Sequence, residues 1–167
     1  LVSALPGIDI HFEDSPEGSH TFIGDQCVDS QIRTLAVSSH VSPVAVIPQV
    51  RNFVDELLVS YGKNGRIVMD GRDIGTSVFP NADLKIFMVA DDKVRAQRRL
   101  NEMVAGGQNP DFQEVLENLK SRDYIDSHRE TSPLRQAEDA VVLDNSDMTL
   151  QDQMVWIKKL VEERFGK

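Results

Sequence analysis

The sequence has little cysteine, few aromatic residues and no long hydrophobic run. Cys27 is the only cysteine in 167 residues, which excludes a disulfide within the chain and a structural zinc site built from several cysteines. We expect Cys27 to be inert packing in a reducing cytoplasm. No apolar run approaches the length of a membrane span, and the opening LVSALPGIDI lacks the pattern of a secretory signal. The sequence therefore predicts a cytoplasmic protein that does not enter a membrane.

Positive charge is also scarce. The chain has 18 lysines and arginines against 27 aspartates and glutamates, so its formal net charge is -9. A molecule of this charge repels polyanions, and a non-specific role on nucleic acid or on an anionic membrane has little electrostatic support. Small phosphates can still bind locally, where arginines gather.

The first part of the chain predicts a small antiparallel hairpin followed by helices. Residues 8–13 (IDIHFE) alternate apolar and polar side chains, turn residues follow, and residues 20–24 (HTFIG) have the pattern of a second strand. Residues 29–40 are weakly helical. After Pro48, which suits the first turn of a helix, apolar residues recur at helical spacing as far as Tyr61.

From residue 66 onward, short apolar strands alternate with helices. The expected strands are residues 67–69, 84–89 and 140–143, and the expected helices are residues 91–107, 110–129 and 149–165. Thr149 with Asp152 has the spacing of a capping box at the start of the last helix. This alternation predicts an α/β fold with a parallel sheet flanked by helices, and the hairpin is a separate element. A chain of this length allows one main domain with a small appendage.

Polar residues follow the first expected strand of the sheet. Ligands of parallel α/β sheets collect beyond the carboxyl ends of the strands, and Asp70, Arg72 and Asp73 lie there. The glycines in and just after this segment, Gly71 and Gly75, allow the backbone to turn sharply. This loop is either a binding loop or a polar turn with an internal ion pair, and the residues alone leave both interpretations open.

The helix at residues 110–129 changes from apolar to charged along one face. Its apolar stripe is Phe112, Val115, Leu116 and Leu119, and the same spacing continues through Arg122, Asp126 and Arg129. Charges on a face directed at the core are costly unless a ligand or partner neutralises them, so we favour a phosphate or sugar at this end of the helix. The alternative is a solvated helix end, with an ion pair between Arg122 and Asp126 contributing about 0.2 to 0.5 kcal/mol.

A second cluster of arginines lies on the preceding helix. Arg95, Arg98 and Arg99 share one side of it, and a polyphosphate would relieve their mutual repulsion. Asp91, Asp92 and Glu102 lie close in sequence, however, and a run of charges on a helix is usually a solvated face. The four histidines, His11, His20, His40 and His128, have no metal-ligand spacing, and we expect surface or packing roles for all of them.

Two stretches carry a resemblance to a known family. The segments IVMDGRDIGTSVFPNADLKIFMVADDKVRAQRR and RDYIDSHRETSPLRQAEDAVVLDNS resemble bacterial cytidylate (CMP) kinases, and the similarity continues backward through IRTLAVSSHVSPVAVIPQVR to cover nearly the whole chain. The resemblance implies a nucleoside-monophosphate-kinase fold with a five-stranded parallel core and a small substrate-binding insert. Residues 1–65 would hold the insert and its connecting helices, and residues 66–167 the rest of the core, with a mobile lid at about residues 91–112.

The resemblance also implies an activity and its residues. Such enzymes transfer a phosphoryl group from ATP to CMP or dCMP with Mg²⁺, as cytoplasmic proteins that are typically monomeric. By position, three residues resemble those that read the cytosine edge, and the pair Arg122 and Asp126 resembles the one that holds the ribose hydroxyls. Arg72 and Arg129 resemble ligands of the substrate phosphate, and Asp70 resembles the carboxylate that orients hydrated magnesium. The base-reading positions are Ser42, Arg51 and Asp73, and the lid positions that approach the transferring phosphates of ATP are Arg95, Arg98 and Arg99.

The sequence departs from the family in one respect. No GxxxxGKS loop, whose amides and lysine cradle the ATP phosphates, occurs in residues 1–167, and the chain begins with Leu1. We therefore expect an amino-terminal truncation and little or no phosphoryl transfer by this polypeptide alone. In the family a first strand precedes this loop and lies between the strands expected here at residues 67–69 and 84–89. We therefore expect that these two close up, that another segment fills the gap, or that the natural protein has residues outside this numbering.

Two other functions stay open at this point. One is a related nucleoside-monophosphate kinase with a different base preference. The other is a catalytically inactive module that binds a nucleotide or a partner, which the missing loop favours.

Overall fold

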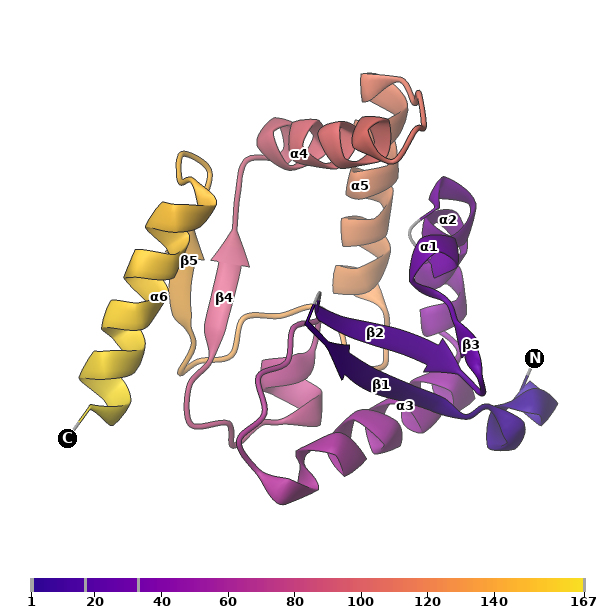
Figure 1. The fold of residues 1–167 in the computed structure, drawn as a ribbon, viewed down its shortest axis with the longest axis horizontal. Coiled ribbons are helices and arrows are strands. Elements are labelled where there is room, and N and C mark those ends of the chain that lie inside the picture. The colour runs from indigo at the N-terminus through magenta and orange to yellow at the C-terminus, as the bar shows by residue number, and fades with distance from the viewer. Residues whose placement is uncertain (1, 17, 33, 167) are drawn as a thin grey trace. The chain divides into compact units, whose positions relative to one another are not determined.

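A computed structural model describes residues 2–16, 18–32 and 34–166, and the chain divides into two compact units (Figure 1). The first unit consists of Leu1–Val68 and His128–Pro133, and the second of Met69–Ser127 and Leu134–Lys167. Glu17, which falls in the turn expected between the first two strands, lies outside the described residues.

The first unit contains an antiparallel sheet of three strands in the order β1-β2-β3. The strands are β1 (Ile10–Ser15), β2 (Gly18–Ile23) and β3 (Gln26–Cys27). The predicted hairpin is confirmed as β1 and β2. The sequence did not predict β3, because a strand of two residues is too short to show an alternating pattern.

The two faces of this sheet have different neighbours. On one face, the rings of Phe12 and Tyr61 meet edge to face with centroids 5.4 Å apart, and the Tyr61 hydroxyl donates a hydrogen bond to the Ile10 carbonyl (2.6 Å). Burial, and then the charge of Asp9, raise the pKa of Tyr61, so its hydroxyl keeps the proton that it donates. The other face carries His11 and Phe22, which stack with centroids 5.4 Å apart. One face of the sheet thus packs on the helix that ends at Tyr61.

The described residues of the first unit also form three α-helices, α1 (Asp29–Ile32), α2 (Leu35–Ala45) and α3 (Pro48–Tyr61), and two short 3-10 helices, Val2–Gly7 and Gly62–Asn64. The Thr34 hydroxyl caps α2 by accepting a hydrogen bond from the Val37 amide (3.3 Å), and Pro48 opens α3 as predicted. The helical pattern predicted for residues 29–40 therefore occurs as two helices. Leu5, Val28 and Ser42 are buried.

The second unit contains two parallel strands and three helices. The strands β4 (Ile86–Val89) and β5 (Val141–Asp144) pair in parallel with Ile86 opposite Val141, which confirms the predicted parallel sheet. The helices are α4 (Asp92–Ala105), α5 (Phe112–His128), whose last residue belongs to the first unit, and α6 (Leu150–Phe165). Each of them had been predicted from the sequence, with ends that differ by a few residues.

Both ends of α6 are tied to the strands beside it (Figure 1). Near its start, the Asn145 amide that follows β5 donates to the Gln153 side chain (3.0 Å), and near its end Arg164 donates to the Asp83 carbonyl ahead of β4 (3.3 Å). The predicted capping box is present, since the Thr149 hydroxyl accepts from the Asp152 amide (3.1 Å) and the Asp152 carboxylate accepts from the Thr149 amide (3.0 Å). The helix is therefore fixed along β4 and β5.

The prediction of a strand at residues 67–69 is wrong. Those residues have no strand structure, Val68 is fully exposed, and among the described residues β4 pairs only with β5. A strand needs a neighbour to satisfy its backbone groups, and an apolar triplet does not form one alone. The expected closing-up of this segment on β4 does not occur. Met88 and Val142 also remain exposed on the two-stranded sheet.

The second unit buries a small apolar core. Its buried apolar residues are Val78, Ala96, Met103, Val115, Leu116 and Leu143. Ala96 and Met103 lie two turns apart on α4 and therefore on the same side of that helix. Within the described residues, no helix is both long and apolar enough to cross a membrane.

Candidate functional site

The loop of residues 70–73 ends in a tight π-helical turn, Ile74–Val78. The Asp73 carbonyl accepts hydrogen bonds from the amides of Thr76 (3.2 Å) and Ser77 (2.8 Å), and the Asp73 side chain is buried. The backbone bends at residues 71–73, as expected for this loop, but Gly71 does not have a positive φ. A Cβ at Gly71 would lie 2.8 Å from Cγ1 of Ile74, so the loop needs glycine there for close packing.

Arg72 of this loop contacts the charged end of α5. The Arg72 guanidinium forms ion pairs with Asp123 (Nη1 to Oδ1, 3.0 Å) and with Asp126 (Nε to Oδ2, 3.1 Å). The Asp126 side chain is only 4% exposed. The structure thus brings together two of the predicted site residues, Arg72 and Asp126, and places the carboxylate on the inward face as the spacing predicted.

Asp123 also binds Arg95, which comes from α4. Arg95 Nη1 donates to Asp123 Oδ2 (2.6 Å), and its other terminal nitrogen pairs with Asp92. Burial lowers the pKa of Arg95, but the hydrogen bonds to Asp123 and Asp92 outweigh it and raise the pKa on balance. Asp123 was not among the site residues predicted from the sequence. Its spacing could have indicated it, because Asp123 lies four residues after Leu119 and so continues the apolar stripe.

Arg122 is the arginine of this group whose positive charge is disfavoured by its surroundings. Burial, and next the charge of Arg72, lower the pKa of Arg122, while Asp126 opposes this effect. A lowered pKa means that the surroundings disfavour the charged form of the guanidinium. An anion bound beside Arg122 would stabilise the charged form of its guanidinium. The end of α5 is therefore suited to a phosphate or to acceptor oxygens of a ligand.

The remaining arginines of α4 have different contacts. Arg98 donates to the Asn145 side chain (Nη1 to Oδ1, 2.9 Å) and to the Asn145 carbonyl (Nη2, 2.7 Å), which attaches α4 to the segment between β5 and α6. Arg99 pairs with Glu102 one turn later (3.2 Å). Their expected roles toward ATP phosphates stay predictions.

The first unit holds a second charged group. Arg51 is buried and pairs with Asp55 (Nη2 to Oδ1, 2.8 Å), while buried Arg129 donates through Nε to the Ser132 carbonyl (2.8 Å). The Ser132 hydroxyl donates to the second oxygen of Asp55 (3.4 Å). Asp55 and Ser132 therefore join two predicted ligand residues. Sequence reasoning missed both, although Asp55 stands four residues after Arg51 on a helix.

Two further predicted residues show contrasting environments. Ser42 is fully buried, and its hydroxyl has no hydrogen-bond partner among the described residues. Buried hydroxyl groups nearly always have a partner, so an orphaned one points to a missing ligand or water. Asp70 is exposed. A single solvated carboxylate fits Mg²⁺ held through water, because this ion keeps several waters and takes few protein ligands.

Comparison with known proteins agrees with this arrangement. A family model described as cytidylate kinase matches residues 1–163. The chain belongs to the cytidylate kinase family. It is 48% identical to the cytidylate kinase of Bacteroides thetaiotaomicron over all of this chain and 72% of that protein.

Other members of the family give the same result. The cytidylate kinase of Parabacteroides distasonis is 47% identical over 99% of this chain and 73% of its own length, and that of Flavobacterium psychrophilum is 47% identical over 96% and 72%. Family membership confirms the expected fold class, a nucleoside-monophosphate-kinase fold with a parallel sheet and a small antiparallel insert.

Proposed function

We propose that this chain binds CMP or dCMP and acts in the transfer of a phosphoryl group from ATP to give CDP or dCDP. The observation that carries the proposal is the end of α5, where buried Asp126 and the disfavoured cation Arg122 meet Arg72. The names of the related proteins support the reaction class. A guanidinium whose charged form is disfavoured, beside a buried carboxylate, suits a ligand with both hydroxyl and phosphate groups.

In this proposal, different residues bind the ribose, the phosphate and the base of the nucleotide. Arg122 and Asp126 would hold the ribose hydroxyls, and Arg72 and Arg129 the substrate phosphate. The orphaned hydroxyl of Ser42 supports its assignment to the base edge, since a ligand amine or carbonyl would satisfy it. The other residues proposed to read the base are Arg51 and Asp73. Such a set selects cytosine because a wrong base leaves buried polar groups unpaired.

Phosphoryl transfer needs positioning and charge neutralisation more than covalent help. The lid arginines, Arg95, Arg98 and Arg99, would neutralise charge on the transferring phosphates of ATP, and Arg95 would have to exchange its bonds with Asp123 and Asp92 for bonds to phosphate. Bound Mg²⁺ would neutralise phosphate oxygens, and Asp70 would orient its waters.

The proposal is tested by calorimetry and a coupled ADP assay on a polypeptide of residues 1–167. We expect CMP and dCMP to bind more tightly than UMP and AMP. Since this stretch contains no GxxxxGKS motif, we expect turnover at least about 100-fold below that of the Bacteroides thetaiotaomicron enzyme, because loss of even one transition-state donor costs about that factor. Absence of CMP binding would overturn the proposal, and turnover at the relative's rate would overturn the expected inactivity.

A second function remains for the same polypeptide, a nucleotide-binding module without turnover. The observation that favours it is the sequence itself, which lacks the loop for the donor phosphates in residues 1–167. Tight CMP binding with no ADP formed, at any ATP concentration, is the result that supports it.

Asp55 provides a test of the group in the first unit. We expect Asp55→Asn to weaken CMP binding about tenfold, because it removes the charge that holds Arg51 and loosens the link through Ser132 to Arg129. Calorimetry with CMP measures the change. The matched control is Glu56→Gln, which removes an exposed carboxylate from the next position of α3 and should bind CMP normally. Equal affinities for the two variants would contradict a positioning role for Asp55.

A further inference from the structure

The small sheet and the start of α1 bring three metal-binding side chains together. Phe22 of β2 stands opposite Cys27 of β3, and the ladder continues with the Val28 amide donating to the Thr21 carbonyl (2.9 Å). Since opposed residues and alternate residues of a strand share a face, His20 and Cys27 lie on the same side of the sheet. Asp29, the first residue of α1, lies against His20.

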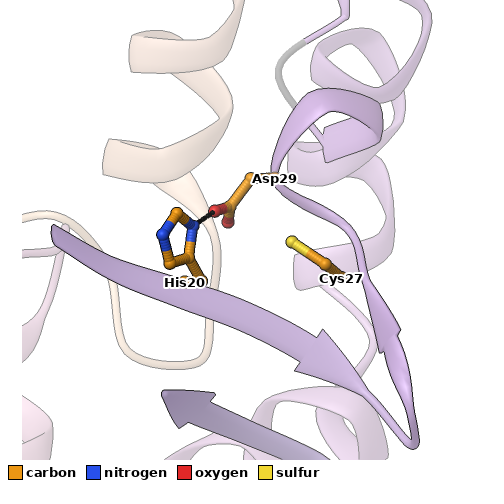
Figure 2. A group of neighbouring side chains, drawn as sticks. All are labelled: His20, Cys27 and Asp29. Carbon is orange, nitrogen blue, oxygen red and sulfur yellow. Dashed lines mark hydrogen bonds and ion pairs between the residues drawn. The ribbon is translucent and has the colours of Figure 1, made fainter. Parts of the chain in front are cut away.

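The donor atoms of these side chains already lie close enough together to resemble a metal-binding site. His20 Nδ1 and Asp29 Oδ2 are 2.9 Å apart, and the ligand atoms of all three residues lie within 4.8 Å of one another. Figure 2 shows the His20 ring directed at the Asp29 carboxylate and the Cys27 sulfur turned toward the same space. One sulfur, one nitrogen and one oxygen donor therefore surround a common point.

Neighbouring groups orient two of the three ligands. The Ser15 hydroxyl is hydrogen-bonded to His20 Nε2 (3.0 Å), and the Thr21 amide donates to Asp29 Oδ1 (3.0 Å). These bonds leave Nδ1 of the ring and Oδ2 of the carboxylate as the atoms that face each other. Outer partners of this kind fix the ring orientation of histidine ligands in metal sites.

One expectation from the sequence is corrected here: Cys27 was expected to be inert packing, but it is exposed and lies beside His20. The histidines show no metal-ligand spacing in the sequence, and a metal site would give His20 a role other than the surface or packing role expected for it. The familiar spacings describe ligands on helices and in short knuckles. A hairpin brings residues seven positions apart together through strand register, which those spacings do not cover.

We propose that His20, Cys27 and Asp29 bind a divalent transition metal ion of the zinc type. Thiolate, imidazole and carboxylate together suit Zn²⁺ or Co²⁺ and not Mg²⁺ or Ca²⁺, which prefer oxygen ligands alone. Three protein ligands leave the fourth tetrahedral position to water or to an external ligand. The site lies in the first unit and shares no residue with the set proposed to bind the nucleotide.

The movement needed to close the site is small. Zinc bonds of about 2.0 to 2.3 Å at tetrahedral angles place donor atoms about 3.3 to 3.6 Å apart. The pair His20 and Asp29, at 2.9 Å, has to open by about 0.4 Å as the ion replaces the proton between them. Cys27 has to approach by about 1.5 Å at most, which a rotation of its exposed side chain supplies.

The test is a titration of the 167-residue chain with Co²⁺ alone, followed by absorption spectroscopy. Cys27 is the only cysteine, so a sulfur-to-cobalt charge-transfer band reports this residue and no other. We expect one Co²⁺ per chain, intense visible bands typical of tetrahedral geometry, and displacement by Zn²⁺. This readout does not depend on phosphoryl transfer or on CMP binding.

Substitutions of single residues test which side chains bind the Co²⁺ ion. We expect Cys27→Ala, which removes an exposed side chain, to abolish the charge-transfer band, and His20→Asn to weaken binding by at least about 100-fold, the upper range for outer partners. The control His40→Asn should bind Co²⁺ unchanged, because His40 lies on α2 and is hydrogen-bonded to the Ala36 carbonyl. Circular dichroism of each variant checks the fold.

Three results would overturn the proposal. They are the absence of a charge-transfer band at saturating Co²⁺, an unchanged affinity in a folded His20→Asn chain, and one metal ion per two chains. The last would mean that Cys27 binds the ion between molecules instead of within this site.

Discussion

Replacing Arg122 with methionine is expected to weaken CMP binding about 30- to 150-fold, while the free chain unfolds with nearly unchanged stability. Hydrogen bonds to charged groups contribute about 2 to 3 kcal/mol, which corresponds to this factor in affinity. The stability of the free chain should hold because burial and the charge of Arg72 already disfavour the Arg122 cation. Methionine preserves most of the apolar stem and removes the repulsion. Calorimetry and urea denaturation measure the two effects.

The matched control for this prediction is Lys120→Met. Lys120 is an exposed cation two residues earlier on α5, and its loss should change neither CMP binding nor stability by more than about 0.5 kcal/mol. A free chain destabilised by Arg122→Met with CMP affinity intact would show that Arg122 is a structural cation, and the proposed ligand at the end of α5 would lose its support.

Asp126→Ala, unlike Arg122→Met, is expected to destabilise the free chain, by about 2 kcal/mol. Removing one partner of a buried ion pair costs about 3 to 5 kcal/mol, and the partial exposure of Arg72 reduces this figure. The change leaves Arg72 and Arg122 with one carboxylate, Asp123, in place of two. CMP binding should also fall at least tenfold, through the lost contact with the ribose. Urea denaturation and calorimetry of the variant test both expectations.

A double variant separates the electrostatic explanation from simple loss of packing. If Asp126 stabilises the chain by neutralising arginines, then adding Arg122→Met to Asp126→Ala should recover about 1 kcal/mol of the lost stability. The isosteric Asp126→Asn change keeps the packing and should lose nearly as much stability as Asp126→Ala. Strictly additive effects of Arg122→Met and Asp126→Ala, or a fully stable Asp126→Asn chain, would contradict this explanation.

Local pattern in the sequence predicted most of the elements. Apolar spacing located α3, α5 and α6, because a helix that packs on a core must place apolar residues at a period near 3.6. The helix α4 was expected between Asp91 and the glycines that end it, Gly106 and Gly107. The inward position of Asp126 followed from the same stripe, since a face that is buried for three turns stays buried for the next. The resemblance located Ser42, Arg51 and Arg129, which the structure finds buried.

The sequence by itself therefore determined where the long helices lie, that the end of α5 carries an inward carboxylate, and the family to which the chain belongs. The tertiary structure alone decided which distant groups meet. Asp123 bridges Arg72 and Arg95, Asp55 joins Arg51 to Ser132, and residues 67–69 have no strand partner. It also decided that His20, Cys27 and Asp29 converge. The physical reason is that periodicity records burial along one element, whereas a hydrogen bond or ion pair depends on which other backbone lies beside it.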